Sequence, residues 1–390
     1  MKFYAHQQRA VDENPRKALW NWEMRVGKSL PASVWVNNPC RNRNAYIIVK
    51  KQNKKDWLNM AGVARVLTKE EFKKENIVDP SAIVFDEAHN AGAALFVRRG
   101  VGRSQIAEKF YRLCQRYPEM DVLLLTATPI RNDAWSLHTL LCYIGVYYDW
   151  KAWREEFFEQ RTAHYLKRQP WMAADMMPTA WYPRDDWRKN IRKYLDKHAD
   201  IVPLSAVVEY LPPLLPVVVK VKTPRYKHPT DKVVTWVDEH LHEQTEKVKE
   251  VLALGYDKII VVAHYTAQID MLALALREDR AVFVLDGRTK DAAATIAAAQ
   301  AAPECYLICQ SGMGFGWDGW MFGAMVFASM GHSVVNHTQM LGRLRHPQHL
   351  KSTSVYYLIG GRWDGKIYET VSEGEDFSPF KHAPQPTETE

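Results

Sequence analysis

Two stretches of the chain carry residues whose types and spacing suit phosphate chemistry. The first, Glu23–Ser29, reads EMRVGKS and precedes a helix-compatible stretch that begins near Leu30. A glycine turn that opens a helix directs backbone N–H groups toward a bound anion, and the helix N-terminus favours negative charge. Lys28 would reach the β- and γ-phosphates of a nucleotide, and the Ser29 hydroxyl would ligate Mg²⁺. The first glycine of the GxxxxGK[ST] pattern is missing, so this motif alone is equally typical of a surface turn.

The second stretch is an apolar run that ends in two carboxylates. Ile83–Phe85 is followed directly by Asp86 and Glu87, which places both carboxylates at the carboxyl edge of a parallel sheet, where open α/β folds bind ligands. Asp86 is positioned to hold Mg²⁺, directly or through water, and Glu87 to orient or deprotonate an attacking water. Alone, the pair is as typical of a solvated acidic turn. A phosphate loop followed by an acidic strand end favours a nucleotide site.

Composition excludes several classes of protein. The chain of 390 residues is 47% hydrophobic and 25% charged, which is typical of a globular protein and not of a disordered one. No window approaches about 18 uninterrupted apolar residues, and the N-terminal segment lacks the apolar region of a secretory signal. We therefore expect a cytoplasmic protein without a membrane span. The five cysteines form no CxxC pair, which argues against a zinc site or a disulfide framework.

The net charge of +7 is unevenly distributed. The last 20 residues hold five acidic residues and one lysine, so the rest of the chain carries 51 basic and 40 acidic residues. A basic body suits a phosphate-rich partner such as nucleic acid, although charge alone does not identify one.

Short apolar runs that alternate with helix-compatible stretches predict an α/β fold. The runs are 45–49, 82–85, 122–126, 258–263, 281–285, 305–309 and 325–328. They form one group before residue 130 and another after residue 257, and the alternation implies parallel sheets with helices on both faces. We expect a first domain at 1–149, a tryptophan-rich helical extension at 150–210, a proline-rich linker at 211–224, a second domain at 225–371 and an acidic flexible tail at 372–390.

The motifs, taken in order, resemble those of a known family. Asp86–His89 is a DEAH box, and Leu123–Asn132 (LLLTATPIRN) resembles the LLLTGTPIQN of Swi/Snf-type ATPases in helicase superfamily two. Glu23–Ser29 matches their EMGLGKT, with Arg25 and Val26 replacing Gly and Leu. Further resemblances follow in the family's order at 6–10, 47–57, 258–270, 285–287, 312–318 and 339–345. The resemblance spans roughly residues 4–360.

This resemblance implies two RecA-like domains with ATP and Mg²⁺ in the cleft between them. The implied catalytic residues are Lys28, Asp86, Glu87, Arg343 and Arg345, and the implied metal ligands are Ser29 and Asp86. The implied ATP contacts are Gln7, Arg25, Val26, Gly27, Lys28, Ser29, Leu30, Gly316, Asp318 and Gln339. His89, Thr126 and Thr128 would couple hydrolysis to movement, and Lys50, Lys51 and Trp57 would contact nucleic acid. An arginine finger is worth about 10³–10⁵ in rate in other phosphoryl-transfer systems.

The sequence departs from the family pattern at motif VI. The family usually has two arginines three residues apart, whereas this chain has Arg343 and His346, with Arg345 one residue early. We therefore expect the arginine finger at Arg343, with Arg345 as a second candidate. Lys50 and Lys51 stand where proline is usual in the family; they suit a phosphate-backbone contact, and they are nearly as typical of a solvated turn.

The tryptophan-rich extension has two interpretations. Its tryptophans are Trp150, Trp153, Trp171, Trp181 and Trp187, which stand among many charged residues. Such a group more often forms a small apolar core packed on the first domain. Aromatic–basic alternation also occurs in grooves for single-stranded nucleic acid. We favour the first interpretation.

The resemblance implies an ATP-dependent DNA translocase or helicase that acts as a monomer and favours duplex over single-stranded DNA. Its brevity resembles compact versions encoded by bacteriophages, which would act in replication, recombination or repair in the host cytoplasm. Two alternatives stay open. One is an RNA-directed helicase, because no residue reports recognition of the 2′-OH. The other is a nucleotide-gated nucleic-acid-binding protein whose hydrolysis is impaired by the altered motif VI.

Overall fold

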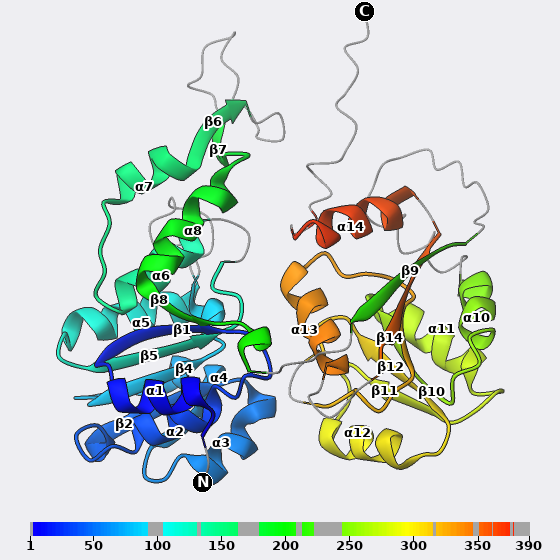
Figure 1. Ribbon diagram of the computed structural model, residues 1–390, viewed down its shortest axis with the longest axis horizontal. Coiled ribbons are helices and arrows are strands. Elements are labelled where there is room, and N and C mark those ends of the chain that lie inside the picture. The colour runs from blue at the N-terminus through cyan, green and yellow to red at the C-terminus, as the bar shows by residue number, and fades with distance from the viewer. Residues whose placement is uncertain are drawn as a thin grey trace, which may run out of the picture. The chain divides into compact units, whose positions relative to one another are not determined.

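The protein divides into two compact units, residues 1–207 and 208–390. They appear from blue to green and from green to red in Figure 1. The computed structural model describes residues 3–92, 104–130, 134–162, 179–207, 213–221, 244–314, 317–345, 351–360, 362–374 and 377. Each unit has its own sheet and its own apolar core.

The first unit is built on a six-stranded parallel sheet with the strand order β3-β2-β4-β5-β1-β8. Its strands are β1 (Lys17–Trp22), β2 (Ala45–Val49), β3 (Arg65–Thr68), β4 (Ala82–Asp86), β5 (Asp121–Thr126) and β8 (Ala199–Val202). The helices around it are α1 (Ala5–Glu13), α2 (Ser29–Val36), α3 (Lys54–Met60), α4 (Lys69–Lys74), α5 (Gln105–Arg116) and α6 (Trp135–Tyr143). In Figure 1, α1 and α2 lie on one side of this sheet, and α5 and α6 lie on the other.

The central strands of this sheet are buried along their whole length. Every residue of β2, β4 and β5 is buried, because helices cover both faces of a parallel sheet. Helix α5 contributes the buried side chains Ile106, Phe110 and Leu113 at the spacing of one helical face. The strands expected at 45–49, 82–85 and 122–126 are confirmed.

The second unit has a six-stranded parallel sheet with the order β11-β12-β10-β13-β14-β9. Its strands are β9 (Leu214–Lys220), β10 (Lys258–Ala263), β11 (Val282–Leu285), β12 (Cys305–Gln310), β13 (Ala324–Phe327) and β14 (Thr353–Ile359). Its helices are α10 (Gln244–Leu252), α11 (Thr266–Leu276), α12 (Ala292–Ala301), α13 (Val334–Leu344) and α14 (Arg362–Ser372). The expected fold class, two α/β units of the RecA-like type with parallel sheets and surrounding helices, is confirmed. Within the described residues, no helix is both long enough and apolar enough to span a bilayer.

The structure corrects the expected linker and tail. Leu214–Lys220 of the predicted linker is the edge strand β9, which pairs in parallel with β14. Proline is compatible with an edge strand because one side of such a strand makes no ladder hydrogen bonds. Most of 372–390 lies outside the described residues, but Phe377 does not fray. Its side chain is only 4% exposed, it packs in the core of the second unit, and its N–H donates to the carbonyl of His332 at 2.8 Å.

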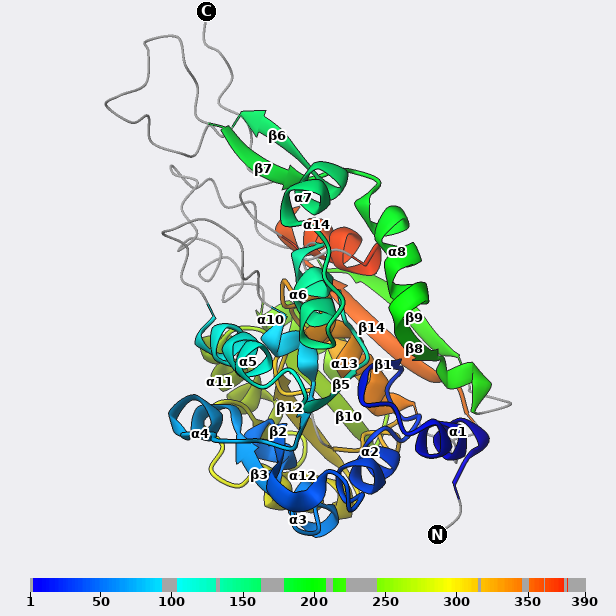
Figure 2. The same ribbon diagram turned by 90° about the vertical axis from the view of Figure 1, so that its left-hand side faces the viewer.

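The tryptophan-rich segment extends the first unit rather than standing apart from its core. It forms α7 (Trp150–Phe157), an antiparallel pair β6 (Phe158–Thr162) and β7 (Thr179–Pro183), and α8 (Trp187–His198), which leads into β8. Figure 2 shows β6 and β7 projecting beyond α7 and α8. Trp153 and Trp187 are buried in the first core, as the favoured interpretation predicts. Trp150 and Trp181 are exposed, and the Arg154 guanidinium lies over both rings. Trp171 lies outside the described residues.

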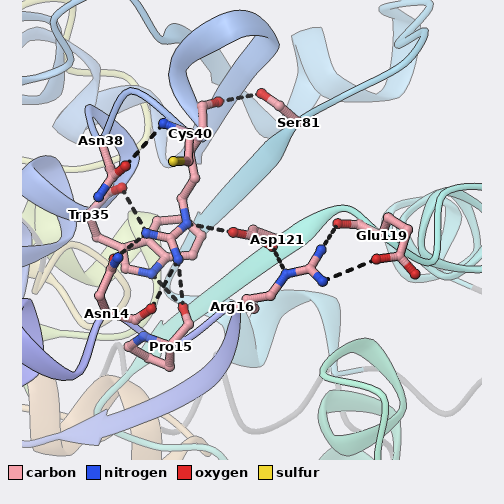
Figure 3. A network of polar contacts seen from close by, with 10 residues as sticks. Asn14, Pro15, Arg16, Trp35, Asn38, Cys40, Ser81, Glu119 and Asp121 are labelled. Atoms are coloured by element: carbon pink, nitrogen blue, oxygen red, sulfur yellow. Dashed lines mark hydrogen bonds and ion pairs between the residues drawn. The ribbon is translucent and has the colours of Figure 1, made fainter.

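A buried guanidinium ties together the edge of the first sheet where its strands begin. Arg41 Nε donates to Asp121 Oδ2 at 2.6 Å, and Arg41 Nη2 donates to the carbonyls of Asn14 and Pro15, each at 3.1 Å. The guanidinium also lies 4.2 Å from the Trp35 ring centroid. The network, which Arg16 and Glu119 extend at the surface, is drawn in Figure 3. Arg41 therefore joins the start of β5 to the segment before β1 and to α2.

We expect Arg41→Ala to lower the free energy of unfolding by about 3–5 kcal/mol, because it leaves the Asp121 carboxylate without its buried partner. The matched control is Arg43→Ala, which removes an exposed arginine two residues away and should change stability by less than about 0.5 kcal/mol. Urea unfolding measures both. Equal losses in the two variants would contradict the assigned role of Arg41.

A buried neutral histidine lies beneath α7. His138 is 1% exposed, and its Nε2 donates to the carbonyl of Tyr148 at 3.0 Å. Its ring contacts Trp135 and Trp153. Burial lowers the pKa of His138.

The lowered pKa of His138 predicts a loss of stability on acidification. Below about pH 6.5 this histidine binds a proton in the unfolded chain but not in the folded one, so its contribution, present above that pH, is lost as the pH falls. Between pH 7.5 and 5.5 the loss should be larger in the wild type than in His138→Phe. Urea unfolding at the two pH values tests this, and identical pH dependence in both proteins would refute it.

Candidate nucleotide site

The loop between β1 and α2 has the backbone shape of an anion site. Arg25 and Gly27 adopt left-handed conformations, with φ of 72° and 79°. Such residues curve successive N–H groups into a concave turn that accepts anions. Helix α2 begins directly after the loop at Ser29, so its first N–H groups and the serine hydroxyl lie at the loop's end.

Lys28 is held within this loop. Its Nζ donates to the carbonyls of Trp22 at 2.8 Å and Glu23 at 3.2 Å. Its positive charge opposes the rise that burial causes in the pKa of Asp86 and helps to lower the pKa of Glu87, so the lysine acts electrostatically on both carboxylates of the predicted site.

Gln7 supports the loop from α1. Its Nε2 donates to the carbonyls of Gly27 at 3.0 Å and Val26 at 3.4 Å, and its Oε1 accepts from the Tyr4 N–H at 2.9 Å. A Cβ at residue 27 would lie 2.5 Å from Gln7 Nε2 and would be strained at this positive φ, so the position favours glycine. The predicted contact between Gln7 and ATP stays a prediction; the structure shows the side chain bonded to the loop.

Asp86 ends β4 in a buried polar environment and is 7% exposed. Its Oδ2 accepts from Trp57 Nε1 at 3.1 Å and Asn53 Nδ2 at 3.2 Å, and its Oδ1 accepts from the Glu87 N–H at 3.1 Å. Burial and the charge of Glu87 raise the pKa of Asp86, against the hydrogen bonds from Asn53 and Trp57 and the charge of Lys28. A buried carboxylate with mainly neutral donors is suited to bind a cation.

Glu87 is kept ionised by its neighbours. Its backbone is left-handed, with φ of 53°, and its Oε2 lies 3.2 Å from His89 Nδ1. Burial acts to raise the pKa of Glu87, but the hydrogen bond and charge of His89, together with the charges of Lys28 and Lys50, lower it to about 2. The side chain is therefore a proton acceptor at neutral pH.

His89 links the acidic strand end to β5. Asn90 Nδ2 lies 3.0 Å from His89 Nε2. His89 Nδ1 lies 3.2 Å from Thr126 Oγ1 and 3.4 Å from Thr128 Oγ1. The residues predicted to couple hydrolysis to movement thus lie together, although the coupling itself stays a prediction.

These features meet because β5 lies between β4 and β1. The strand registers pair Asp86 with Leu125 and Asn21 with Thr126, so three strands end side by side. Asp86 and Ser29 offer oxygen ligands of the kind that Mg²⁺ prefers. Within the part of the chain that the structure describes, no cluster of three His, Cys, Asp or Glu side chains could hold a metal ion.

Trp57 is not available to nucleic acid in this structure. It is 1% exposed, and its indole N–H bonds to Asp86; the nucleic-acid contact expected of Trp57 stays a prediction. Lys50 is half-buried and Lys51 is exposed, and the nucleic-acid contact expected of these two lysines stays a prediction.

Two residues of the second unit predicted for catalysis lie at the end of α13. Arg343 Nη1 donates to the carbonyl of Trp317 at 2.9 Å, and its Nε donates to the carbonyl of Gln339 at 3.3 Å. Arg345 directly follows the helix and is exposed. Arg343 is thus positioned by backbone carbonyls, whereas Arg345 faces solvent.

The other predicted ATP contacts of the second unit are only partly described. Gln339 is 1% exposed, and its amide atoms make no hydrogen bond within the described residues. The carbonyl of Asp318 accepts from Gln300 Nε2 at 2.7 Å. Gly316 and His346 lie outside the described residues.

Asn53 is a residue that the motifs did not indicate. It precedes α3 and stands four positions before Trp57, so both side chains lie on one side of the helix start. This spacing was the available signal in the sequence, but only the structure shows that both side chains donate to Asp86.

Neither a protein-family model nor a curated protein sequence matches this chain. Among solved structures, the chain is similar to the SWI2/SNF2 ATPase core of Sulfolobus solfataricus in complex with dsDNA. The identity is 13%, the alignment covers 96% of this chain and 91% of that chain, and the TM-score is 0.41. The assignment of the fold rests on the two parallel sheets described above.

We expect Gln7→Ala to lower the free energy of unfolding by about 1–3 kcal/mol, because it removes a buried side chain that hydrogen-bonds to the loop between β1 and α2. It should also weaken binding of a fluorescent ATP analogue. The matched control is Gln8→Ala, because the exposed Gln8 side chain bonds to Asp12 on the same helix. Urea unfolding and a fluorescence titration measure the two effects, and a Gln7→Ala protein that matches Gln8→Ala in both would exclude this role.

Proposed function

We propose that this protein is a nucleic-acid-stimulated ATPase that uses Mg²⁺ and acts as an ATP-dependent DNA translocase or helicase. One observation carries the proposal: the Lys28 loop, the carboxylates of Asp86 and Glu87, and the Thr126 hydroxyl meet at one edge of the first sheet. Phosphoryl transfer to water requires a loop that binds the phosphate anion, a carboxylate that binds a cation and an ionised base. This edge of the sheet provides all three.

Each residue of the first unit has a distinct role in this proposal. Lys28 exchanges its bonds to loop carbonyls for bonds to phosphate oxygens and neutralises their charge. Ser29 and Asp86 hold Mg²⁺, which supplies further positive charge to the phosphates when bound. Glu87 accepts a proton from the attacking water on its carboxylate. His89 holds that carboxylate and connects it to Thr126 and Thr128.

The proposal assigns the arginine finger to Arg343 of the second unit. Its guanidinium is held by the carbonyls of Trp317 and Gln339, which supports a fixed position for a charge that phosphoryl transfer needs. Arg345 is the second candidate. A charge supplied by the second unit would make hydrolysis depend on both units, which is how ATP turnover would drive movement along DNA.

The basic body of the chain and the order of its motifs support DNA as the partner, with duplex favoured. An RNA-directed helicase is the second candidate, since the site in the first unit would serve either nucleic acid. A binding protein with impaired hydrolysis is the third, and the unusual motif VI, with Arg345 exposed, is the observation that favours it.

ATP hydrolysis by the purified chain, alone and with duplex DNA, single-stranded DNA or RNA, tests the proposal. We expect duplex DNA to stimulate turnover most. Lys28→Ala should abolish the stimulation, because the phosphates lose their counter-charge. Glu87→Gln should lower the turnover rate by about 10²–10⁴-fold, the usual contribution of a general base, while it still binds a fluorescent ATP analogue.

The matched control is Lys74→Ala, which removes an exposed lysine at the end of α4 and should leave turnover unchanged. Stimulation only by RNA would move the assignment to the second candidate. ATP binding without turnover under any condition, with Glu87→Gln unchanged from wild type, would establish the third candidate and exclude the motor.

A further inference from the structure

The segment after β2 joins the predicted nucleic-acid residues directly to the carboxylate of the magnesium site. Strand β2 ends at Val49, Lys50 follows it, and a 3₁₀ turn, η2 (Lys51–Asn53), leads into α3. Asn53 stands only three positions after Lys50 in the chain. A contact made at the start of this segment is therefore one short turn away from the site.

Two side chains of this segment donate to one carboxylate oxygen. Asn53 Nδ2 and Trp57 Nε1 lie 3.2 Å and 3.1 Å from Asp86 Oδ2. Both are neutral donors, so they orient the carboxylate without cancelling the negative charge that a cation would need. Removing either donor would leave Asp86 free to turn away from its present direction.

Asn53 also brings an acceptor to this place. Its Oδ1 is buried and makes no hydrogen bond within the described residues. A buried amide oxygen without a partner costs about 1–3 kcal/mol, which is explained if it accepts from a bound group. Water on magnesium is a suitable donor, because Mg²⁺ usually keeps several waters in protein sites.

The segment is stiff enough to transmit a displacement. The Asn53 N–H donates to the carbonyl of Lys50 at 3.0 Å, which closes the turn. The next residue, Lys54, forms an ion pair with Glu71 at 2.7 Å, and the hydrogen bond from Lys54 lowers the pKa of Glu71 to about 2. The Trp57 side chain is fixed by its burial.

We propose that Asn53 and Trp57 are positioning residues that transmit nucleic-acid contact at Lys50 and Lys51 to the magnesium-binding carboxylate of Asp86. When a phosphate backbone binds the lysines, the turn would shift, and the two donors would set the Asp86 carboxylate in the orientation that holds Mg²⁺. This inference rests on the proposed function and names the route by which nucleic acid stimulates it.

The test uses the full chain and the variants Trp57→Phe and Asn53→Ala. The first readout is the Mg²⁺ concentration that gives half-maximal binding of a non-hydrolysable fluorescent ATP analogue without nucleic acid. We expect this concentration to rise about 10-fold or more, the usual cost of removing a partner of a metal ligand. The second readout is the ratio of ATP turnover with and without duplex DNA, which should fall toward one.

The matched control is Trp153→Phe. It removes another buried indole N–H, which donates to the carbonyl of Ala134 and not to Asp86. We expect it to lose thermal stability, as Trp57→Phe does, without either functional change, which separates positioning from packing. Should Trp57→Phe fail to fold, the half-buried Asn53 allows the same test.

Wild-type turnover that no nucleic acid stimulates would overturn the proposed function itself. Normal stimulation of the wild type, with the magnesium requirement and the stimulation ratio unchanged in Asn53→Ala and in folded Trp57→Phe, would overturn this inference alone.

Discussion

The buried ion pair between Arg41 and Asp121 fixes the register on which the site of the first unit depends. Asp121 is the first residue of β5, and Thr126 is the last. Because β5 is hydrogen-bonded to both β1 and β4, holding its start also sets where its end lies relative to the phosphate-type loop and Asp86. A slip of one residue would move Thr126 to the other face of the sheet. The ion pair where the strands begin thus helps to position the groups where the strands end.

Strained backbone occurs at that second edge, at two of the four described non-glycine residues with a left-handed conformation. Arg25 and Glu87 are non-glycine residues in the left-handed region, a conformation that costs on the order of 1–3 kcal/mol and persists only where neighbours hold it. Gln7 bonds to the loop next to Arg25, and His89 bonds to the Glu87 carboxylate. The same contacts that maintain the strain therefore also position the groups assigned to catalysis.

The sequence predicted the parts of this structure that depend on local pattern. Buried parallel strands are continuous apolar runs, so β4 and β5 and the acidic end of β4 could be located from composition along the chain. Contacts between residues that are distant in the sequence could not be predicted. Trp57 and Asp86 are 29 positions apart, and no spacing rule reports that an indole meets a carboxylate across a sheet. The proline-bearing β9 was missed because proline usually ends a strand, and only the topology shows that Pro216 lies on an edge.

Phe377 changes how the last part of the chain should be viewed in evolution. A short acidic sequence beyond the final helix would ordinarily be free to drift, since random substitutions there affect neither packing nor chemistry. Here the phenyl ring fills space against His332 in the core of the second unit. Selection should therefore treat residue 377 as it treats the interior and keep it large and apolar. A stop codon before residue 377 would remove this ring and leave a cavity in the core of the second unit.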